Sequence, residues 1–363
     1  AVRTLGGRLL GPFSMEPGAL VSDLQSRLSQ DMGIIGVRLQ LAKQTGEVLD
    51  PSSALEASEA FAELSLVVLP ASRVALTASA DGTVRLWSLD TGGSAIFCER
   101  GEDVTSAVFS QDGCSVLTAC FDCEAAVYCA LTGGLSALLR GHESWVWSAG
   151  FSPDGSQVVT ASDDHTARLW RPAAGECRGE LRGHEDAVSS GIFSPDGSLV
   201  ATASYDGTTR LWSADSCECL AVLRGHEDGV NAAAFSPDGR SLLTASQDGT
   251  VRLWDVDAGA NVSALLGHEG WVRSASFSPD GRSALTASDD RTAGLWCLAS
   301  GERRASLQGH GHAVTSAAFA PDGLSALTAS VDSSAKLWSL GSAQCVSTLR
   351  GHAAPVLSAV FGA

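Results

Sequence analysis

Long hydrophobic runs are missing from this sequence, although 44% of its 363 residues are hydrophobic. That share is enough for a large core, but no stretch approaches the roughly 20 consecutive apolar residues of a membrane-spanning helix. No basic segment followed by an apolar one opens the chain, as a secretory signal would. We therefore expect no membrane partner and an intracellular location, cytoplasmic or nuclear.

Lysine is nearly absent, since it occurs only at Lys43 and Lys336, and the net charge is -17. Nucleic-acid binding draws most of its affinity from clustered lysine and arginine. The composition therefore argues against a nucleic-acid partner. Many of the acidic residues are aspartates in regularly spaced turns, so we interpret the negative charge as structural and as a contribution to solubility.

The ten cysteines lack the paired spacing of a disulfide framework, so we predict reduced thiols. Four of them gather at Cys114, Cys120, Cys123 and Cys129. The short spacing from Cys120 to Cys123 suits half of a zinc site, but the other two thiols fall on different segments. The sequence therefore predicts packing thiols, no metal and no cofactor.

Regularly spaced landmarks fill the chain from residue 73 onward. Gly-His pairs recur at intervals of about 40 residues and end at His142, His184, His226, His268, His310 and His352. Strand-end tryptophans keep the same spacing at Trp170, Trp212, Trp254, Trp296 and Trp338, and Trp87 ends an earlier predicted strand. Aspartates in predicted turns accompany them, at Asp81, Asp164, Asp206, Asp248, Asp290 and Asp332. A fixed period of this length indicates a repeat fold whose units stack side by side.

With these landmarks, residues 73–363 resemble WD-repeat β-propellers, although only Trp254 and Asp255 form the dipeptide that gives the family its name. Each repeat is expected to form a four-stranded blade. In one repeat the strands read VNAAAF, SLLTAS, TVRLWD and NVSALL, separated by Pro-Asp-Gly, Asp-Gly and Gly-His turns. The small residues of the first strand suit the crowded centre of a ring.

Tyr128 replaces the tryptophan of one repeat. With it, seven aromatic residues mark seven third strands and therefore seven blades. The first blade lacks a first strand, whereas residues 356–361 form a first strand with nothing after it. Pairing these two ends would close the ring and remove both exposed edges. The predicted fold is mainly β: a seven-bladed propeller closed by its C-terminal strand.

Residues 1–70 form a second predicted unit, which resembles ubiquitin. Two strands are expected within 2–15, a helix over 20–33 and further strands at 37–43 and 63–69. The resemblance implies a small α+β domain of the β-grasp type ahead of the propeller.

The same resemblance places a recognition patch at Leu5, Gln40 and Val67 of this domain. Gln40 stands where an apolar residue is expected, and an amide in place of an apolar anchor weakens docking. The last strand runs directly into the propeller, so no free di-glycine tail is available for conjugation.

Each regular repeat offers a histidine, a serine, an aspartate and a tryptophan, such as His226, Ser246, Asp248 and Trp254. Serine, histidine and aspartate together are the parts of a hydrolytic triad. A triad is needed once, however, whereas this group recurs in blade after blade. The resemblance implies a hydrogen-bonded network between loops and sheet, so we interpret the group as structural.

Blade 2 departs from this pattern. It has Arg100, Cys120 and Tyr128 where other blades have His, Ser and Trp, and it keeps only Asp122. We interpret this as joint loss of the network, because a partly satisfied network costs more than none.

Chain direction places the Gly-His loops and the Asp turns on one face of the ring, here called the Gly-His face, and the Pro-Asp-Gly turns on the opposite face. Trp145, Trp147 and Trp271 lie outside the repeat pattern and follow Gly-His pairs. Aromatic side chains that the fold does not require are the best sign of binding, since tryptophan and tyrosine dominate interaction hot spots.

Further residues are predicted at the edge of the same surface. They precede the turn aspartates or share a strand with an extra tryptophan: Phe121, Asp163, Tyr205, Gln247, Asp289 and Arg273. The expected ligand is a peptide or loop whose basic side chain meets the carboxylates of Asp163 and Asp289.

The sequence therefore predicts a non-enzymatic scaffold that binds other proteins. One alternative is a substrate-recognition subunit of a ubiquitin-pathway complex, recruited through the N-terminal domain. A second is an enzyme that uses a cysteine of blade 2, and a third is an assembly platform without a discrete site.

Overall fold

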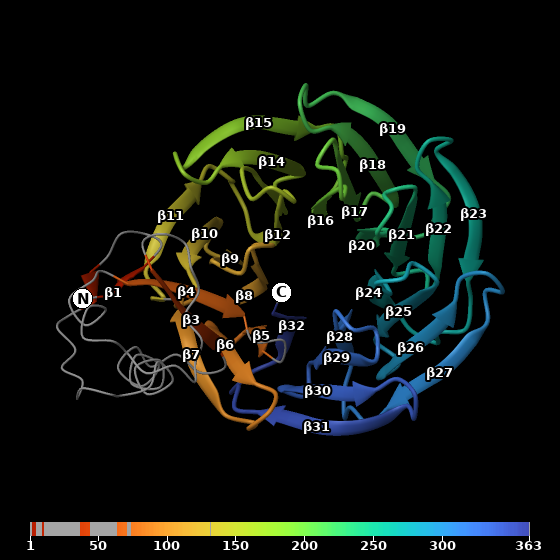
Figure 1. Cartoon of the computed structure of the whole chain (residues 1–363). Coiled ribbons are helices and arrows are strands. Elements are labelled where there is room, and N and C mark those ends of the chain that lie inside the picture. Colours follow the sequence, from red (N-terminus) through yellow and green to blue (C-terminus); the bar gives the residue numbers. More distant parts are fainter. Residues whose placement is uncertain are drawn as a thin grey trace.

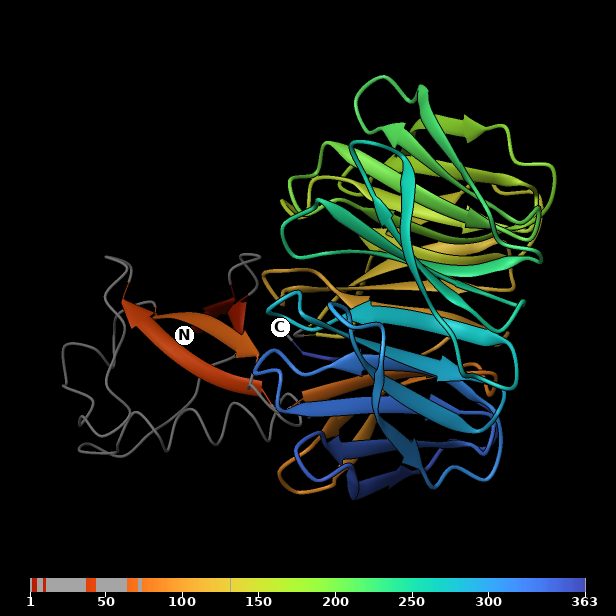
Figure 2. The ribbon, with the colours of Figure 1, turned by 90° about the vertical axis from the view of Figure 1, so that its right-hand side faces the viewer.

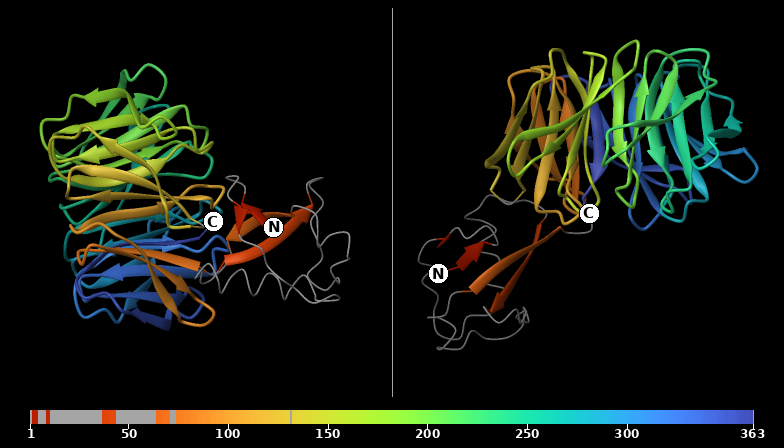
Figure 3. Two further views of the ribbon diagram at one scale, coloured as in Figure 1. Left: turned by 90° about the vertical axis from the view of Figure 1, so that its left-hand side faces the viewer. Right: turned by 90° about the horizontal axis from the view of Figure 1, so that it is seen from above.

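The computed structural model describes residues 2–4, 9–10, 37–43, 64–70, 74–130 and 132–362. From residue 74 on, seven four-stranded sheets stand around a central channel (Figure 1). Edge-on views show a disc whose connecting loops gather on two opposite faces (Figures 2 and 3). Neighbouring strands within every blade are antiparallel.

The four strands of each blade follow one another from the channel outward. Blade 1 contains β32 (Val356–Phe361), β5 (Val74–Ser79), β6 (Thr83–Ser88) and β7 (Ser94–Glu99). Blade 2 contains β8 (Val104–Phe109), β9 (Ser115–Cys120), β10 (Glu124–Cys129) and β11 (Leu135–Arg140). Blade 3 contains β12 (Val146–Phe151), β13 (Val158–Ser162), β14 (Thr166–Arg171) and β15 (Glu176–Arg182).

The remaining blades follow the same plan. Blade 4 contains β16 (Val188–Phe193), β17 (Leu199–Ser204), β18 (Thr208–Ser213) and β19 (Cys219–Arg224). Blade 5 contains β20 (Val230–Phe235), β21 (Ser241–Ser246), β22 (Val251–Asp255) and β23 (Ala260–Leu265). Blade 6 contains β24 (Val272–Phe277), β25 (Ser283–Ser288), β26 (Thr292–Cys297) and β27 (Arg303–Gln308). Blade 7 contains β28 (Val314–Phe319), β29 (Ser325–Ser330), β30 (Ser334–Ser339) and β31 (Gln344–Arg350).

Blade 1 joins the two ends of the propeller, which confirms the predicted closure. β32 pairs antiparallel with β5, from Val356 opposite Ser79 to Phe361 opposite Ala75. Just beyond the strand, the amide of Gly362 donates to the carbonyl of Val74 at 2.7 Å. The ring is therefore closed by hydrogen bonds between residues almost 290 positions apart (362 minus 74).

The core lies between neighbouring sheets rather than within one. Trp254 of blade 5 is buried in a cluster with Leu211 and Leu223 of blade 4, and the other blades repeat this packing. Near the channel the innermost strands are close: a Cβ added to Gly150 would lie 3.5 Å from the carbonyl oxygen of Gly191 in the next blade. This close approach explains the small residues predicted for the first strands.

The described N-terminal strands are β1 (Val2–Thr4), β2 (Leu9–Leu10), β3 (Val37–Lys43) and β4 (Leu64–Pro70). They form one sheet in the order β2-β1-β4-β3, in which β1 and β4 are parallel. Gln40 pairs with Val67 across this sheet, whereas Leu5 and the helix predicted over 20–33 lie outside the described residues. The ubiquitin-like assignment stays a prediction.

Candidate functional site

A buried hydrogen-bonded chain links strand, loop and turn in each regular blade. In blade 5 the indole Nε1 of Trp254 donates to Thr244 Oγ1 at 2.8 Å, and His226 Nε2 lies 2.8 Å from the same oxygen. His226 Nδ1 in turn lies 2.8 Å from Asp248 Oδ2. Because Thr244 accepts from the indole, its own hydroxyl hydrogen is free for Nε2, which leaves Nδ1 protonated to donate to the carboxylate.

Threonine, not serine, is the link that the sequence analysis missed. Ser246 does not bond His226. Its hydroxyl donates to the carbonyl of Gly229 at 2.9 Å and accepts from the amide of Asp248 at 3.1 Å. The expected serine, histidine and aspartate arrangement is therefore not a triad in space, since the hydroxyl that meets the imidazole belongs to Thr244.

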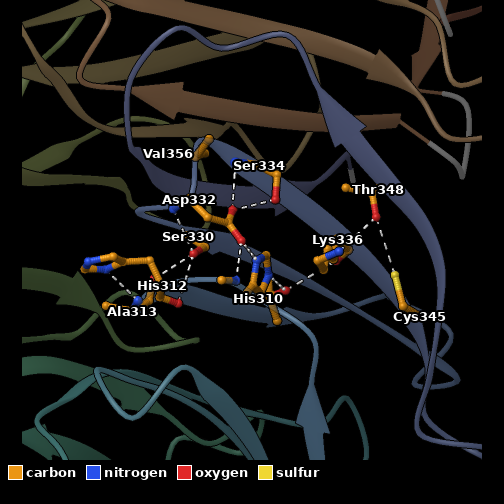
Figure 4. A network of polar contacts seen from close by, with 12 residues as sticks. His310, His312, Ala313, Ser330, Asp332, Ser334, Lys336, Cys345, Thr348 and Val356 are labelled. Atoms are coloured by element: carbon orange, nitrogen blue, oxygen red, sulfur yellow. Dashed lines mark hydrogen bonds and ion pairs between the residues drawn. The ribbon is translucent and has the colours of Figure 1, made fainter.

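The aspartate of each chain also holds the Gly-His loop. In blade 7, shown in Figure 4, Asp332 Oδ2 accepts from His310 Nδ1 at 2.9 Å and from the amide of Gly311 at 2.8 Å. Its Oδ1 accepts from the hydroxyl of Ser334 at 2.6 Å. These bonds tie the Gly-His loop, the turn that holds Asp332 and the start of β30 together on the Gly-His face.

Burial and hydrogen bonding set the charges of these pairs. Burial lowers the pKa of His226, although the hydrogen bond to Asp248 opposes that shift. Burial raises the pKa of Asp248, but the hydrogen bonds from Thr250 and His226 outweigh it, so that this pKa lies below its usual range. At neutral pH the pair is a neutral imidazole donating to a carboxylate, as a structural tie requires.

Blade 2 replaces this network instead of losing it, which corrects the sequence interpretation. Arg100 Nη2 donates to Asp122 Oδ2 at 2.6 Å, and its Nη1 donates to the hydroxyl of Tyr128 at 3.3 Å. The Arg100 side chain is only 8% exposed. A guanidinium thus joins the turn aspartate to the aromatic residue where other blades use histidine and threonine.

Four aromatic residues meet at the channel mouth on the Gly-His face, and we call Phe121, Trp145, Trp147 and Tyr205 the aromatic cluster. Phe121 from blade 2 stacks on Trp145, with ring centroids 4.6 Å apart. Trp147 stands edge-on to both Phe121 and Trp145, and its other neighbour is Tyr205 of blade 4. Trp145 remains 47% exposed, so the cluster is reachable from solvent.

A second aromatic position lies in blade 6. The guanidinium carbon of Arg273 lies 4.9 Å from the ring centroid of Trp271, within the range of a cation–π contact. Arg273 also binds both carboxylate oxygens of Asp289, each at 2.8 Å. Trp271 is 43% exposed. The charge of Asp289 is therefore already matched within the chain.

Trp147 and Arg273 occupy a strand position that serves the fold in other blades. In blades 2, 4, 5 and 7 a polar side chain at this position donates to the backbone carbonyl of the residue that begins the innermost strand of the next blade. The four bonds are Thr105 to Val146, Ser189 to Val230, Asn231 to Val272 and Thr315 to Val356. In blades 3 and 6 the side chains bond instead to the aspartates that precede the turn aspartates of their own blades, Asp163 and Asp289. At these two positions the hydrogen bond to the next blade is replaced by a bond to an aspartate on the Gly-His face.

A family model described as the WD domain, G-beta repeat matches residues 63–88, 133–171, 175–213, 217–255, 259–297 and 301–339. These segments cover more than half of the chain. The chain belongs to the WD40 repeat family. Proteins of this family are typically interaction scaffolds without catalytic activity, and their propellers generally bind other proteins. A comparison with curated proteins gives no match.

Five of the nine predicted binding residues of this WD40 propeller contact one another in blades 2 to 4, whereas Trp271, Arg273 and Asp289 form a separate group in blade 6. Gln247 Nε2 donates to Asn231 Oδ1 at 3.4 Å. Asp289 is engaged by Arg273, as described above. The Asp163 carboxylate has no ion pair in the part of the chain that the structure describes, where its oxygens accept only from Ser144 and Trp147.

The cysteines of blade 2 do not have the environment of a nucleophile. Burial raises the pKa values of Cys114, Cys120 and Cys123. The thiolate is the reactive form, so these shifts disfavour the cysteine-enzyme alternative.

Among the described residues no group of three or more His, Cys, Asp or Glu side chains is arranged to hold a metal. Nor do these residues include a helix with the length and apolarity that crossing a bilayer requires.

Proposed function

We propose that this WD40 propeller is a non-enzymatic scaffold that binds a peptide or exposed loop of another protein across the aromatic cluster and Trp271. The observation that carries the proposal is the position of Trp145 and Trp271, which are large, exposed and not required by the repeat. Aromatic side chains at such places bury much area at little conformational cost. Their equivalents in blade 4 and blade 7 are alanines, Ala187 and Ala313.

Blade 6 suggests which side chain of the partner meets Asp163. There, an arginine lies over Trp271 and binds Asp289 through two hydrogen bonds. Blade 3 repeats the tryptophan and the aspartate as Trp145 and Asp163, but no cation of the chain accompanies them in the described part. We infer that a basic side chain of the partner binds Asp163, and this narrows the original expectation, which also included Asp289.

The test is a peptide-display selection on the immobilised full chain, followed by affinity measurements on the selected peptides. Replacing Trp145, Trp147 and Trp271 together by alanine should weaken binding at least about 100-fold, because each hot-spot aromatic contributes roughly 2 kcal/mol or more. The matched control removes three exposed apolar side chains of outer strands, Leu135, Leu220 and Val346. Equal loss in both variants, or no loss in the first, contradicts the proposal.

A second candidate is a recognition subunit of a ubiquitin-pathway complex, in which residues 1–70 form a ubiquitin-like domain. Its support is the N-terminal sheet, whose first and last described strands are parallel neighbours. Since Gln40 stands at the centre of the inferred patch, Gln40→Ile should strengthen binding of a ubiquitin-interacting helical peptide to the full chain. Unchanged affinity in that titration speaks against this candidate.

A further inference from the structure

The Pro-Asp-Gly face, opposite the proposed peptide site, carries a ring of aromatic side chains of its own. The last residue of every innermost strand is a half-buried phenylalanine, and the seven are Phe109, Phe151, Phe193, Phe235, Phe277, Phe319 and Phe361. Each packs partly against the core between two blades. The innermost strands encircle the channel (Figure 1), so the seven residues surround its opening.

Two hollows adjoin one another inside this ring. One, of about 510 Å³, is lined by residues of blades 2 to 5, and the other, of about 450 Å³, is lined by residues of blades 4 to 7 and blade 1. They share Phe235 and Pro195, so they form one depression. Phenylalanine and proline side chains make up much of its wall, and its size is in the range that binds apolar groups of ligands.

Carboxylates border this apolar depression. Each wall proline from Pro153 onward is followed directly by an aspartate: Asp154, Asp196, Asp238, Asp280 and Asp322. Asp112 takes the corresponding place in blade 2. The hydrogen bond from Ser152 holds the pKa of Asp154 at about 2, and the corresponding serines lower the pKa of Asp112 and Asp196. These three aspartates are therefore anionic at neutral pH, whereas Arg240 and Arg282 lie beside Asp238 and Asp280 and offset their charge.

We propose that this face binds a basic amphipathic helix of a partner protein, with the apolar stripe of the helix in the phenylalanine-lined depression and its lysines or arginines beside the turn aspartates. A helix offers an apolar stripe of suitable width, flanked by long cationic side chains that can reach a surrounding acidic border. Charge complementarity selects this occupant. A second copy of the chain, at -17, and an anionic nucleic acid or membrane would each be repelled.

This inference is independent of the proposed peptide site, because it uses other residues on the opposite face. The probe is a fluorescein-labelled helical peptide built only from lysine and leucine, with the leucines along one stripe, and the readout is fluorescence anisotropy with the full chain. We expect saturable binding that weakens with added salt. A peptide with serine in place of every leucine has the same charge and should not bind.

The variant that tests the acidic border changes Asp112, Asp154, Asp196 and Asp322 to asparagine. Each Oδ1 accepts a backbone amide two residues on, at 2.8–3.0 Å, and the asparagine oxygen can accept the same bond. The matched control changes four exposed glutamates of the Gly-His face to glutamine, at Glu143, Glu185, Glu227 and Glu269. Melting temperatures establish that both variants are folded.

Affinity for the lysine–leucine peptide should fall roughly tenfold or more in the asparagine variant and change less than about twofold in the glutamine variant. Absence of saturable binding to the unmodified chain would overturn the inference. So would equal effects of the two variants, which indicate attraction to net charge alone, or equal binding of the lysine–serine peptide, which indicates that the depression is not used.

Discussion

Arg273 and Asp289 form a two-point ion pair on the Gly-His face, with the Nε and Nη2 atoms of the arginine each 2.8 Å from a carboxylate oxygen. The equivalent pair in blade 3 is Trp147 and Asp163, joined by one bond of 3.4 Å from the indole nitrogen. Two blades built on one repeat therefore differ: the carboxylate in blade 6 is paired with an arginine, whereas the one in blade 3 has no cationic partner among the described residues. This contrast leads to the first prediction.

Replacing Arg273 by alanine should convert blade 6 into a second anionic site. We expect basic peptides that bind the Gly-His face to bind about threefold more tightly or better, with a steeper dependence on salt. Stability should change by less than about 1 kcal/mol, since both partners are partly exposed and surface ion pairs contribute little. Asp163→Asn is the opposite test and should weaken the same peptides. Affinities of both variants that match the original chain would contradict the assignment of Asp163.

The threonine at the centre of each buried chain should matter for stability. Thr244→Val keeps the shape of the side chain but leaves the indole of Trp254 and the imidazole of His226 without their shared partner. We expect a loss of roughly 1–3 kcal/mol in the free energy of unfolding, measured with urea. Thr244→Ser retains the hydroxyl and is the control. A valine variant as stable as the serine variant would show that the hydroxyl is dispensable.

Stability should fall in two steps as the pH is lowered. Burial places the folded-state pKa of His226, His268, His310 and His352 below the ordinary value of 6.5. The unfolded chain therefore takes up these protons first, and this contribution is present above about pH 6.5 and is lost below it.

The second step belongs to the turn aspartates. The pKa values of Asp248 and Asp290 lie below the ordinary value of 3.8, because the hydrogen bonds from threonine and histidine outweigh burial. Their contribution is present above about pH 4 and is lost as the pH falls through the lowered values. Urea midpoints measured from pH 8 to pH 3 check both steps, and a constant midpoint between pH 8 and pH 5 would contradict the first.

Removal of residues 353–363 should strongly destabilise the propeller. The deletion takes away β32 with the buried Val356 and Ala359, and it leaves β5 as an open edge. We expect the melting temperature to fall by about 10 °C or more, since each kcal/mol lost corresponds to roughly 2–4 °C in a domain of this size. Truncation after Gly362 keeps β32 whole and serves as the control. Similar melting curves for the two truncations would argue against an essential closure.

The seven blades and nearly all strand positions could be predicted from the sequence, because turn residues and strand patterns are local signals repeated many times. In blade 5 the expected first strand is the observed β20, Val230–Phe235. Thr244 escaped notice because threonine is common in strands for reasons of propensity alone, so its recurrence did not point to a bonded role.

The side-chain contacts were harder to foresee. The hydrogen bonds of Arg100 in blade 2 depend on the reach of a guanidinium, which a comparison of residue types along the repeat does not include. The stacking of Phe121 on Trp145 joins neighbouring blades, and the pairing of Arg273 with Asp289 joins a strand and a turn of one blade. The sequence placed these residues on one face but did not give their partners.

The pairing of β32 with β5 also has a consequence for synthesis. β5 leaves the ribosome well before its neighbour β32, because the strands of six other blades lie between them in the chain. Blade 1 can therefore be completed only after the other six blades have been translated, and until then the nascent chain carries an unpartnered strand edge of the kind that chaperones shield.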